Sequence, residues 1–107
     1  MELNGSVILL SETDGAIVTS CTLAIIPNLT HCGKPYALIE NVVTHSDHHG
    51  LGFATALLDA ASAHAWDHGC YKIMLMTGSK DKSTLSFYEQ AGFVQSKTGF
   101  QKRRDRV

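Results

Sequence analysis

A glycine-rich turn between an apolar strand and an alanine-rich helix restricts the fold of this chain more than any other feature. The strand spans residues 38–43, the helix continues through residues 54–58, and Gly50 and Gly52 lie between them. Glycine adopts backbone conformations that other residues avoid, so the turn can approach a ligand closely and point several N–H groups the same way. Together with the positive end of the following helix, the turn predicts an anion site suited to a diphosphate.

The turn matches neither of two common phosphate-binding motifs. No Gly-Lys-Ser/Thr follows it, which excludes a P-loop, and Gly50-Leu51-Gly52 is only the first part of the dinucleotide motif Gly-x-Gly-x-x-Gly. The turn is therefore neither a P-loop nor the complete dinucleotide motif.

Residues His49-Gly50-Leu51-Gly52-Phe53-Ala54 resemble the acetyl-CoA signature of the GNAT superfamily of N-acetyltransferases, Arg/Gln-x-x-Gly-x-Gly/Ala. Residues 69–76 resemble the next strand of that family, and Ser86-Phe87-Tyr88-Glu89-Gln90-Ala91-Gly92-Phe93 resembles its closing signature. The resemblance covers roughly residues 6–104. The strand at residues 39–43 and the segment Gly69–Lys72 are also similar to glucosamine-6-phosphate N-acetyltransferases.

This resemblance implies an α/β fold with a mixed, mostly antiparallel sheet and flanking helices, in a single N-acetyltransferase domain over residues 1–107. The resemblance also implies that, compared with the family, the chain is shortened at the N-terminus and lacks the first strand and two helices. Apolar sheet surface left exposed in this way would favour association, so we expect a homodimer whose second subunit completes the acceptor pocket. The alternative is a more open pocket in a monomer.

The activity implied is transfer of an acetyl group from acetyl-CoA to a primary amine of a small molecule, directly within a ternary complex. Main-chain groups around Val42 and Val43 would hold the pantetheine, and the Val43 N–H could polarise the thioester carbonyl. N–H groups of residues 50–55 would hold the diphosphate. The cofactor-binding residues implied are Val42, Val43, Thr44, His49, Gly50, Leu51, Gly52, Phe53, Ala54, Thr55 and Tyr88.

Two residues are candidates for proton transfer. Tyr88 matches the family's general acid, which protonates the leaving thiolate; the alternative is an aromatic side chain packed on the sheet. Glu40 could accept a proton from the amine or bind a cationic acceptor; the alternative is a glutamate facing solvent at the sheet edge. His45 is a second candidate base.

The histidine-rich turn leaves two further readings open. His49 stands where the family has Arg or Gln, and a neutral imidazole offers one donor, so its contact with the diphosphate could depend on pH. His45, Asp47, His48 and His49 are metal-ligand types, but their spacing in a turn does not predict tetrahedral geometry, and we expect no metal. The rival functions are a CoA-binding or interaction module without catalysis and a metal-binding protein.

Composition indicates the class of protein, its expected location and the partners that it is expected to lack. Apolar residues make up 44% and charged residues 18% of the 107, as in an ordered globular protein, and no apolar run reaches membrane-spanning length. No signal peptide opens the chain and the three cysteines form no CxxC pair, so a cytoplasmic location with reduced thiols is expected. Basic residues concentrate after residue 70, where they either attract a polyanionic cosubstrate or form a solvated tail. We expect no nucleic-acid or membrane partner.

Turn signals and periodicity predict the order of elements. Strands are expected at residues 6–11, 16–26, 36–44 and 71–76, with closing strands at 93–96 and 100–103. Helices are expected at residues 52–68 and 82–91, the first with an apolar stripe of Ala54, Leu57, Leu58, Ala61 and Ala65 facing the sheet.

Overall fold

A computed structural model of the protein describes residues 5–44 and 52–105, and the chain divides into two compact units. The first unit is Met1–Leu75 and the second is Met76–Val107. That residues 1–107 act as a single domain stays a prediction.

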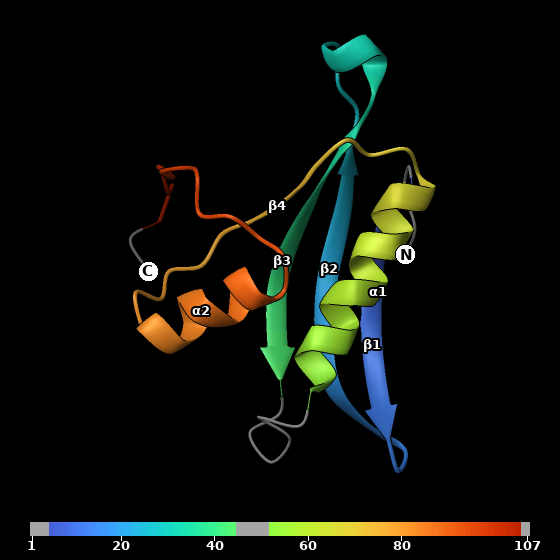
Figure 1. Ribbon diagram of the computed structural model, residues 1–107, viewed down its shortest axis with the longest axis vertical. Helices are drawn as coiled ribbons and strands as arrows, with labels where there is room; N and C mark the ends of the chain where they lie inside the picture. The colour runs from blue at the N-terminus through green and yellow to red at the C-terminus, as the bar shows by residue number, and fades with distance from the viewer. Residues whose placement is uncertain (1–4, 45–51, 106–107) are drawn as a thin grey trace. The chain divides into compact units, whose positions relative to one another are not determined.

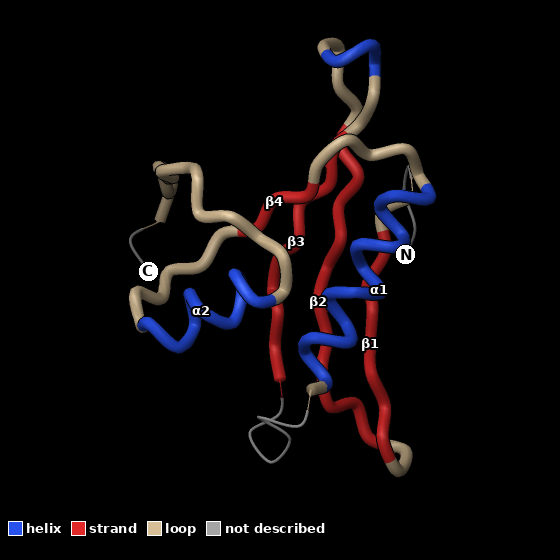
Figure 2. The backbone as a smooth tube through the Cα atoms, viewed as in Figure 1, coloured by secondary structure: helices blue, strands red, loops and turns tan. Residues whose placement is uncertain are grey.

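The first unit contains a four-stranded sheet with one face covered by a helix (Figures 1 and 2). Its strands are β1 (Val7–Thr13), β2 (Ala16–Ile26), β3 (Tyr36–Thr44) and β4 (Ile73–Leu75), in the order β1-β2-β3-β4. The pairs β1/β2 and β2/β3 are antiparallel, and β3/β4 is parallel. The mixed, mostly antiparallel sheet predicted from the sequence is confirmed.

The hairpin between β1 and β2 closes at Asp14-Gly15, where both residues have positive φ, 53° and 78°. A two-residue turn with positive φ at both positions matches the right-handed twist of the flanking strands, and Asp-Gly is among the pairs that favour it. A short 3-10 helix, η1 (His31–Gly33), lies in the connection from β2 to β3.

Helix α1 (Phe53–Asp67) provides the crossover between the parallel strands β3 and β4 and packs on β1, β2 and β3 (Figure 1). Of its predicted stripe, Leu57, Leu58, Ala61 and Ala65 are buried. They face a sheet core whose fully buried side chains include Val18, Leu23 and Ile39. The small alanines let helix and sheet approach closely, so this layer holds the core of the first unit.

The second unit contains helix α2 (Lys82–Gln90), which begins after Asp81 and ends before Gly92 at a φ of 99°. The helix agrees with the prediction, but the closing strands predicted at residues 93–96 and 100–103 are wrong, because the described chain is irregular there. Val94 and Phe100 are 83% and 95% exposed. Apolar alternation forms a strand only where a neighbouring strand pairs with it, and two short strands alone are marginal. Neither described helix of eight residues or more could cross a membrane.

Strand β4 is also shorter than predicted, at three residues instead of the six from Tyr71 to Met76. Its parallel pairing with β3 is confined to Ala37↔Ile73, Leu38↔Met74 and Ile39↔Leu75. The register of β3 shifts directly after Ile39, between Glu40 and Val43, and the ladder between β3 and β4 ends at that point.

Candidate functional site

Strand β3 contains a β-bulge at Asn41. Thr22 pairs with Glu40 and Ser20 pairs with Val43, so two residues of β3 lie opposite one residue of β2. Asn41 has a φ of 57°, a conformation that asparagine tolerates better than other residues with a side chain. Without the extra residue, positions 40 and 43 would point to opposite faces of the sheet. The bulge therefore brings Glu40 and Val43 to the same face.

Beyond the bulge, one edge of β3 has no neighbouring strand among those described. The pairing with β4 ends at Ile39, whereas the pairing with β2 continues to Thr44. Main-chain groups between Glu40 and Val43 that point away from β2 therefore face an open edge. An extended ligand with amide groups can bind such an edge as an added strand would.

The first turn of α1 lies at the same end of the first unit as the end of β3 and the start of β2 (Figure 1). Gly52 is the N-cap at a φ of 81°, and Ala54 and Thr55 follow in the first turn. N–H groups of a first turn have no carbonyl partner within the helix, and they carry the positive end of the helix dipole. No acidic residue lies in this turn, so no carboxylate competes there with an anion.

Glycine is required at position 52 by the backbone conformation and not by crowding from neighbouring atoms. A Cβ atom at Gly52 would have no heavy atom within 4 Å, but its positive φ strains any residue that has a side chain. This glycine therefore sets the direction in which α1 begins.

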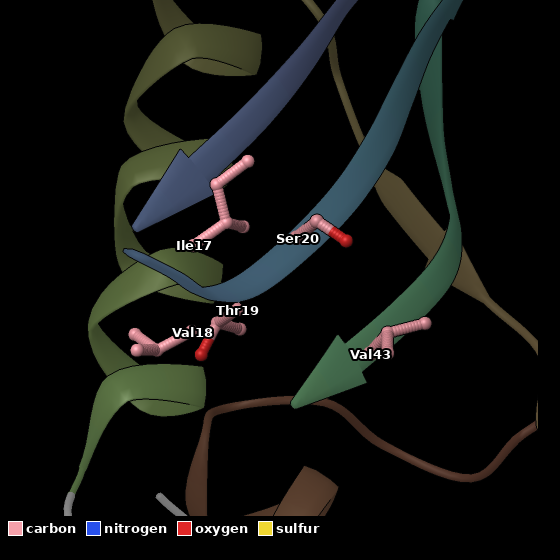
Figure 3. Close-up of a pocket in the computed structure, with 5 residues that line it drawn as sticks. All are labelled: Ile17, Val18, Thr19, Ser20 and Val43. Carbon is pink, nitrogen blue, oxygen red and sulfur yellow. The ribbon is translucent and has the colours of Figure 1, made fainter. Parts of the chain in front are cut away.

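A shallow hollow of about 130 Å³ lies beside the end of β3, lined by Ile17, Val18, Thr19, Ser20 and Val43 (Figure 3). In Figure 3 the side chains of Val18 and Thr19 leave β2 on the opposite side from those of Ile17 and Ser20. Burial agrees, because Val18 and Thr19 are 2% and 1% exposed and Ile17 is 53% exposed. A register shift in the β1/β2 ladder at Ser11/Glu12 causes these two consecutive residues to be buried.

Thr19 carries an unusual buried hydroxyl. Its Oγ1 is buried and has no hydrogen-bond partner among the residues described. A buried hydroxyl without a partner costs roughly 1–3 kcal/mol. The side chain contributes to the α1 side of the sheet and not to the face that carries Glu40 and Val43.

Tyr88 lies in α2 of the second unit, half-buried in an aromatic cluster. Its ring makes edge contacts with Phe87 and Phe93, at centroid distances of 5.2 Å and 6.4 Å. Burial raises the pKa of the Tyr88 phenol above its ordinary value. The phenol is therefore protonated at neutral pH, which is the state that a proton donor requires.

The structure thus brings together part of the site predicted from the sequence. Val42, Val43 and Thr44 end β3, and Gly52, Phe53, Ala54 and Thr55 begin α1, all in the first unit. His49, Gly50 and Leu51, together with the candidate base His45 and the metal candidates Asp47 and His48, lie outside the described residues. Across the part of the chain that is described, no three metal-ligand side chains form a group.

Neither buried cysteine has the environment of a nucleophile that could carry the acetyl group as a covalent acetyl-enzyme. Cys21 and Cys70 are buried, and desolvation raises the pKa of both thiols. A nucleophilic cysteine needs a lowered pKa so that its thiolate is populated. These two thiols therefore favour packing roles over an acetyl-enzyme.

Two residues of the site were not predicted from the sequence. Asn41 is responsible for the bulge, and Ser20 faces Val43 across the ladder. An asparagine in the middle of an apolar strand was the available signal for Asn41, since asparagine is depleted in strands and enriched at positive φ. Ser20 had no signal of its own, because its neighbour on β3 depends on the bulged register.

Comparison with known proteins gives a family match over most of the chain. The model of the acetyltransferase (GNAT) family matches residues 2–93. A glucosamine 6-phosphate N-acetyltransferase from Trypanosoma brucei brucei is 35% identical over 82 residues, which are 77% of this chain and 54% of that protein. The chain therefore spans about half the length of this curated relative.

Two solved structures share the fold. One from Agrobacterium tumefaciens str. C58, assigned to the acetyltransferases, has a TM-score of 0.89 and 45% sequence identity, covering 94% of this chain and 69% of that chain. A glucosamine-6-phosphate N-acetyltransferase from Arabidopsis thaliana has a TM-score of 0.85 at 24% identity, covering 95% of this chain and 69% of that chain. At that identity the second likeness bears on the fold alone.

Proposed function

Because this chain belongs to the acetyltransferase (GNAT) family, we propose that it transfers an acetyl group from acetyl-CoA to a primary amine of a small molecule. The transfer is direct, within a ternary complex of protein, acetyl-CoA and amine. The observation that carries this proposal is the open, bulged edge of β3 beside the first turn of α1. It combines main-chain groups for an extended thioester arm with N–H groups for a diphosphate.

In this proposal, acetyl-CoA binds along the end of β3. First-turn N–H groups of α1, including those of Ala54 and Thr55, hold the diphosphate, and main-chain groups of Val42 and Val43 hold the pantetheine. The Val43 N–H polarises the thioester carbonyl. Phe53, Gly52 and Thr44 complete the described part of the binding segment, and His49, Gly50 and Leu51 are predicted to extend it.

The proton balance assigns roles to Glu40 and Tyr88. The amine nitrogen forms the C–N bond of the amide while the C–S bond of the thioester breaks. The nitrogen loses one proton, which Glu40 accepts directly or through water, and the leaving thiolate gains one proton, which Tyr88 donates. Glu40 is exposed and lies on the same face as Val43, which supports its role toward the amine.

The role of Tyr88 is supported by its place in the closing signature and by its protonation. Tyr88 is a member of the sequence Phe87-Tyr88-Glu89, and burial keeps its phenol protonated at neutral pH. In the family, the tyrosine at this position is the candidate acid. Its contact with acetyl-CoA is likewise part of the proposal.

The competing reading is a CoA-binding or interaction module without catalysis. Both readings require uptake of CoA, but only the enzyme forms an acetylated amine. A homodimer and a cytoplasmic location also stay predictions.

The experiment that tests the proposal is titration of the folded protein with CoA by calorimetry, followed by acetyl transfer to a panel of primary amines. Binding with turnover is expected. Absence of CoA uptake by folded protein would contradict the proposal, whereas uptake without transfer to any amine would favour the module. Circular dichroism of the same sample establishes that the protein is folded.

A further inference from the structure

The face of the sheet opposite α1 carries two rows of side chains that cross β1, β2 and β3. Residues paired directly across a ladder point to the same face, so the registers define these rows. We call them the outer rows: Leu10–Ser20–Val43 and Ile8–Thr22–Glu40. They are adjacent on β2, roughly 7 Å apart for two residues of strand. The outer rows therefore cover the area of a small molecule.

Each outer row has a hydroxyl at its centre: Leu10 and Val43 flank Ser20, and Ile8 and Glu40 flank Thr22. Ile8, Leu10 and Val43 are 59%, 49% and 59% exposed. Among the described residues, Ser20, Thr22 and Glu40 make no side-chain hydrogen bond or ion pair within the protein. These three polar groups are therefore available to a ligand that also covers the apolar side chains.

Charge on this sheet has one sign. Strands β1 to β4 contain the carboxylates of Glu12 and Glu40 and no Lys, Arg or His. Among the side chains of these described strands, a phosphate placed on the outer rows would meet the carboxylate of Glu40 and no cation, whereas an ammonium would pair with Glu40. Complementarity of charge therefore favours an acceptor whose charged group is its amine alone.

We propose that the acceptor is an unphosphorylated primary amine with an apolar body, bound across the outer rows. Its ammonium binds at the carboxylate of Glu40 and the hydroxyl of Thr22, which are direct neighbours in one row. The ammonium releases one proton to water before the reaction, and the neutral amine gives a second proton to Glu40 as the C–N bond forms. Its body lies on Leu10 and Ile8, and the Ser20 hydroxyl takes a polar substituent. This inference rests on the proposed function, because Val43 at the end of the other row is the residue proposed to meet the thioester.

The bulge at Asn41 allows the amine and the thioester to bind on the same side of the sheet. It places Glu40 and Val43 on one face, so the group that deprotonates the amine and the N–H that polarises the thioester belong to neighbouring positions. The acetyl group would then reach the amine from the open edge of β3, while the body of the amine extends toward β1.

Acceptor preference tests the inference. Phenethylamine, glucosamine and glucosamine 6-phosphate are compared as acceptors with acetyl-CoA held constant, after CoA binding to the folded protein has been measured. We expect kcat/KM for glucosamine to exceed that for glucosamine 6-phosphate at least about 10-fold, the effect of one unfavourable charge contact of about 1.4 kcal/mol. We also expect kcat/KM for phenethylamine to exceed that for glucosamine, because its body is apolar. If CoA binds but glucosamine or glucosamine 6-phosphate is preferred to phenethylamine, the inference is overturned. Failure to bind CoA would instead overturn the proposed function.

A pair of matched variants tests the role of Thr22. Thr22→Val removes the hydroxyl in the outer row, and KM for phenethylamine is expected to rise about 2- to 10-fold, the effect of one lost hydrogen bond. Thr19→Val makes the same change on the same strand but on the α1 side, and it should leave that KM unchanged. The affinity for CoA should stay constant in both variants. An unchanged KM for Thr22→Val, or an equal rise for Thr19→Val, would overturn the assignment.

Discussion

The two units of the molecule are built on different principles. The first unit has a core of fully buried side chains between α1 and the sheet, including Leu23, Ile39 and Leu58. In the described part of the second unit no residue is buried, and its one described helix, α2, depends on local signals: Gly92 just after its end and the ring contacts of Tyr88 with Phe87 and Phe93. Structure held by a core tolerates irregularities such as the bulge of β3, whereas structure held by local signals ends where those signals end. The first unit should therefore determine stability, and the second should contribute chemistry at little cost in stability.

The largest expected effect is on stability, from truncation in each unit. Leu23 is fully buried and Val94 is 83% exposed. Leu23→Ala should lower the free energy of unfolding by about 2–5 kcal/mol, through lost apolar burial and the cavity left behind. Val94→Ala should change it by less than about 0.5 kcal/mol, as for most exposed positions. Urea denaturation followed by circular dichroism measures both, and equal losses would break the contrast between the units.

The next effect is on turnover, from Tyr88→Phe in the second unit. Loss of the phenolic proton donor should lower kcat by about 100-fold or more, a contribution typical of general acid catalysis. CoA affinity and the melting temperature should change little, because the ring and its contacts with Phe87 and Phe93 are kept. Steady-state kinetics and calorimetry measure the two quantities. Full activity in the variant would show that Tyr88 has a packing role.

The third effect concerns the bulge. Asn41→Val forces a β-branched residue to a φ of 57° and should cost about 1–2 kcal/mol, whereas Asn41→Gly accepts that conformation. The valine variant should also lose CoA affinity, because a β3 strand without its bulge would turn Val43 to the α1 side. Denaturation and calorimetry compare the two variants. Equal CoA affinity in wild type and both variants would show that CoA binding does not require the bulge.

The smallest expected effect is a change of stability at high pH. Burial raises the pKa of Tyr88 in the folded protein above that of the unfolded chain, which is about 10. Below pH 10 both states hold the phenolic proton, so its full contribution is present; the contribution is lost as pH rises through the folded-state pKa, because the unfolded chain ionises first. Melting temperatures measured from pH 9 upward should fall less in Tyr88→Phe than in wild type. An equal fall of the melting temperature with pH in both proteins would contradict a raised pKa of Tyr88 in the folded state.

Much of the first unit could be predicted from local patterns. The predicted strands at residues 16–26 and 36–44 have the observed bounds, and the α1 stripe faces the sheet as predicted. These elements have strong periodicity and clear turn residues at their ends, such as Asp14-Gly15. The second unit shows the opposite case. Residues 93–96 and 100–103 have strand-like composition, but pairing partners outside the local sequence decide whether such segments become strands.

The amino-acid sequence by itself determined the family, through the turn before α1 and the signature around Tyr88, because both motifs depend on residue types at fixed spacing. It also determined where β2 and β3 begin and end, since apolar periodicity and turn chemistry are local. Only the tertiary structure decided that Glu40 and Val43 share a face with Ser20 and Thr22. Strict alternation would place positions 40 and 43 on opposite faces, and the register between β2 and β3 corrects this by one bulged residue.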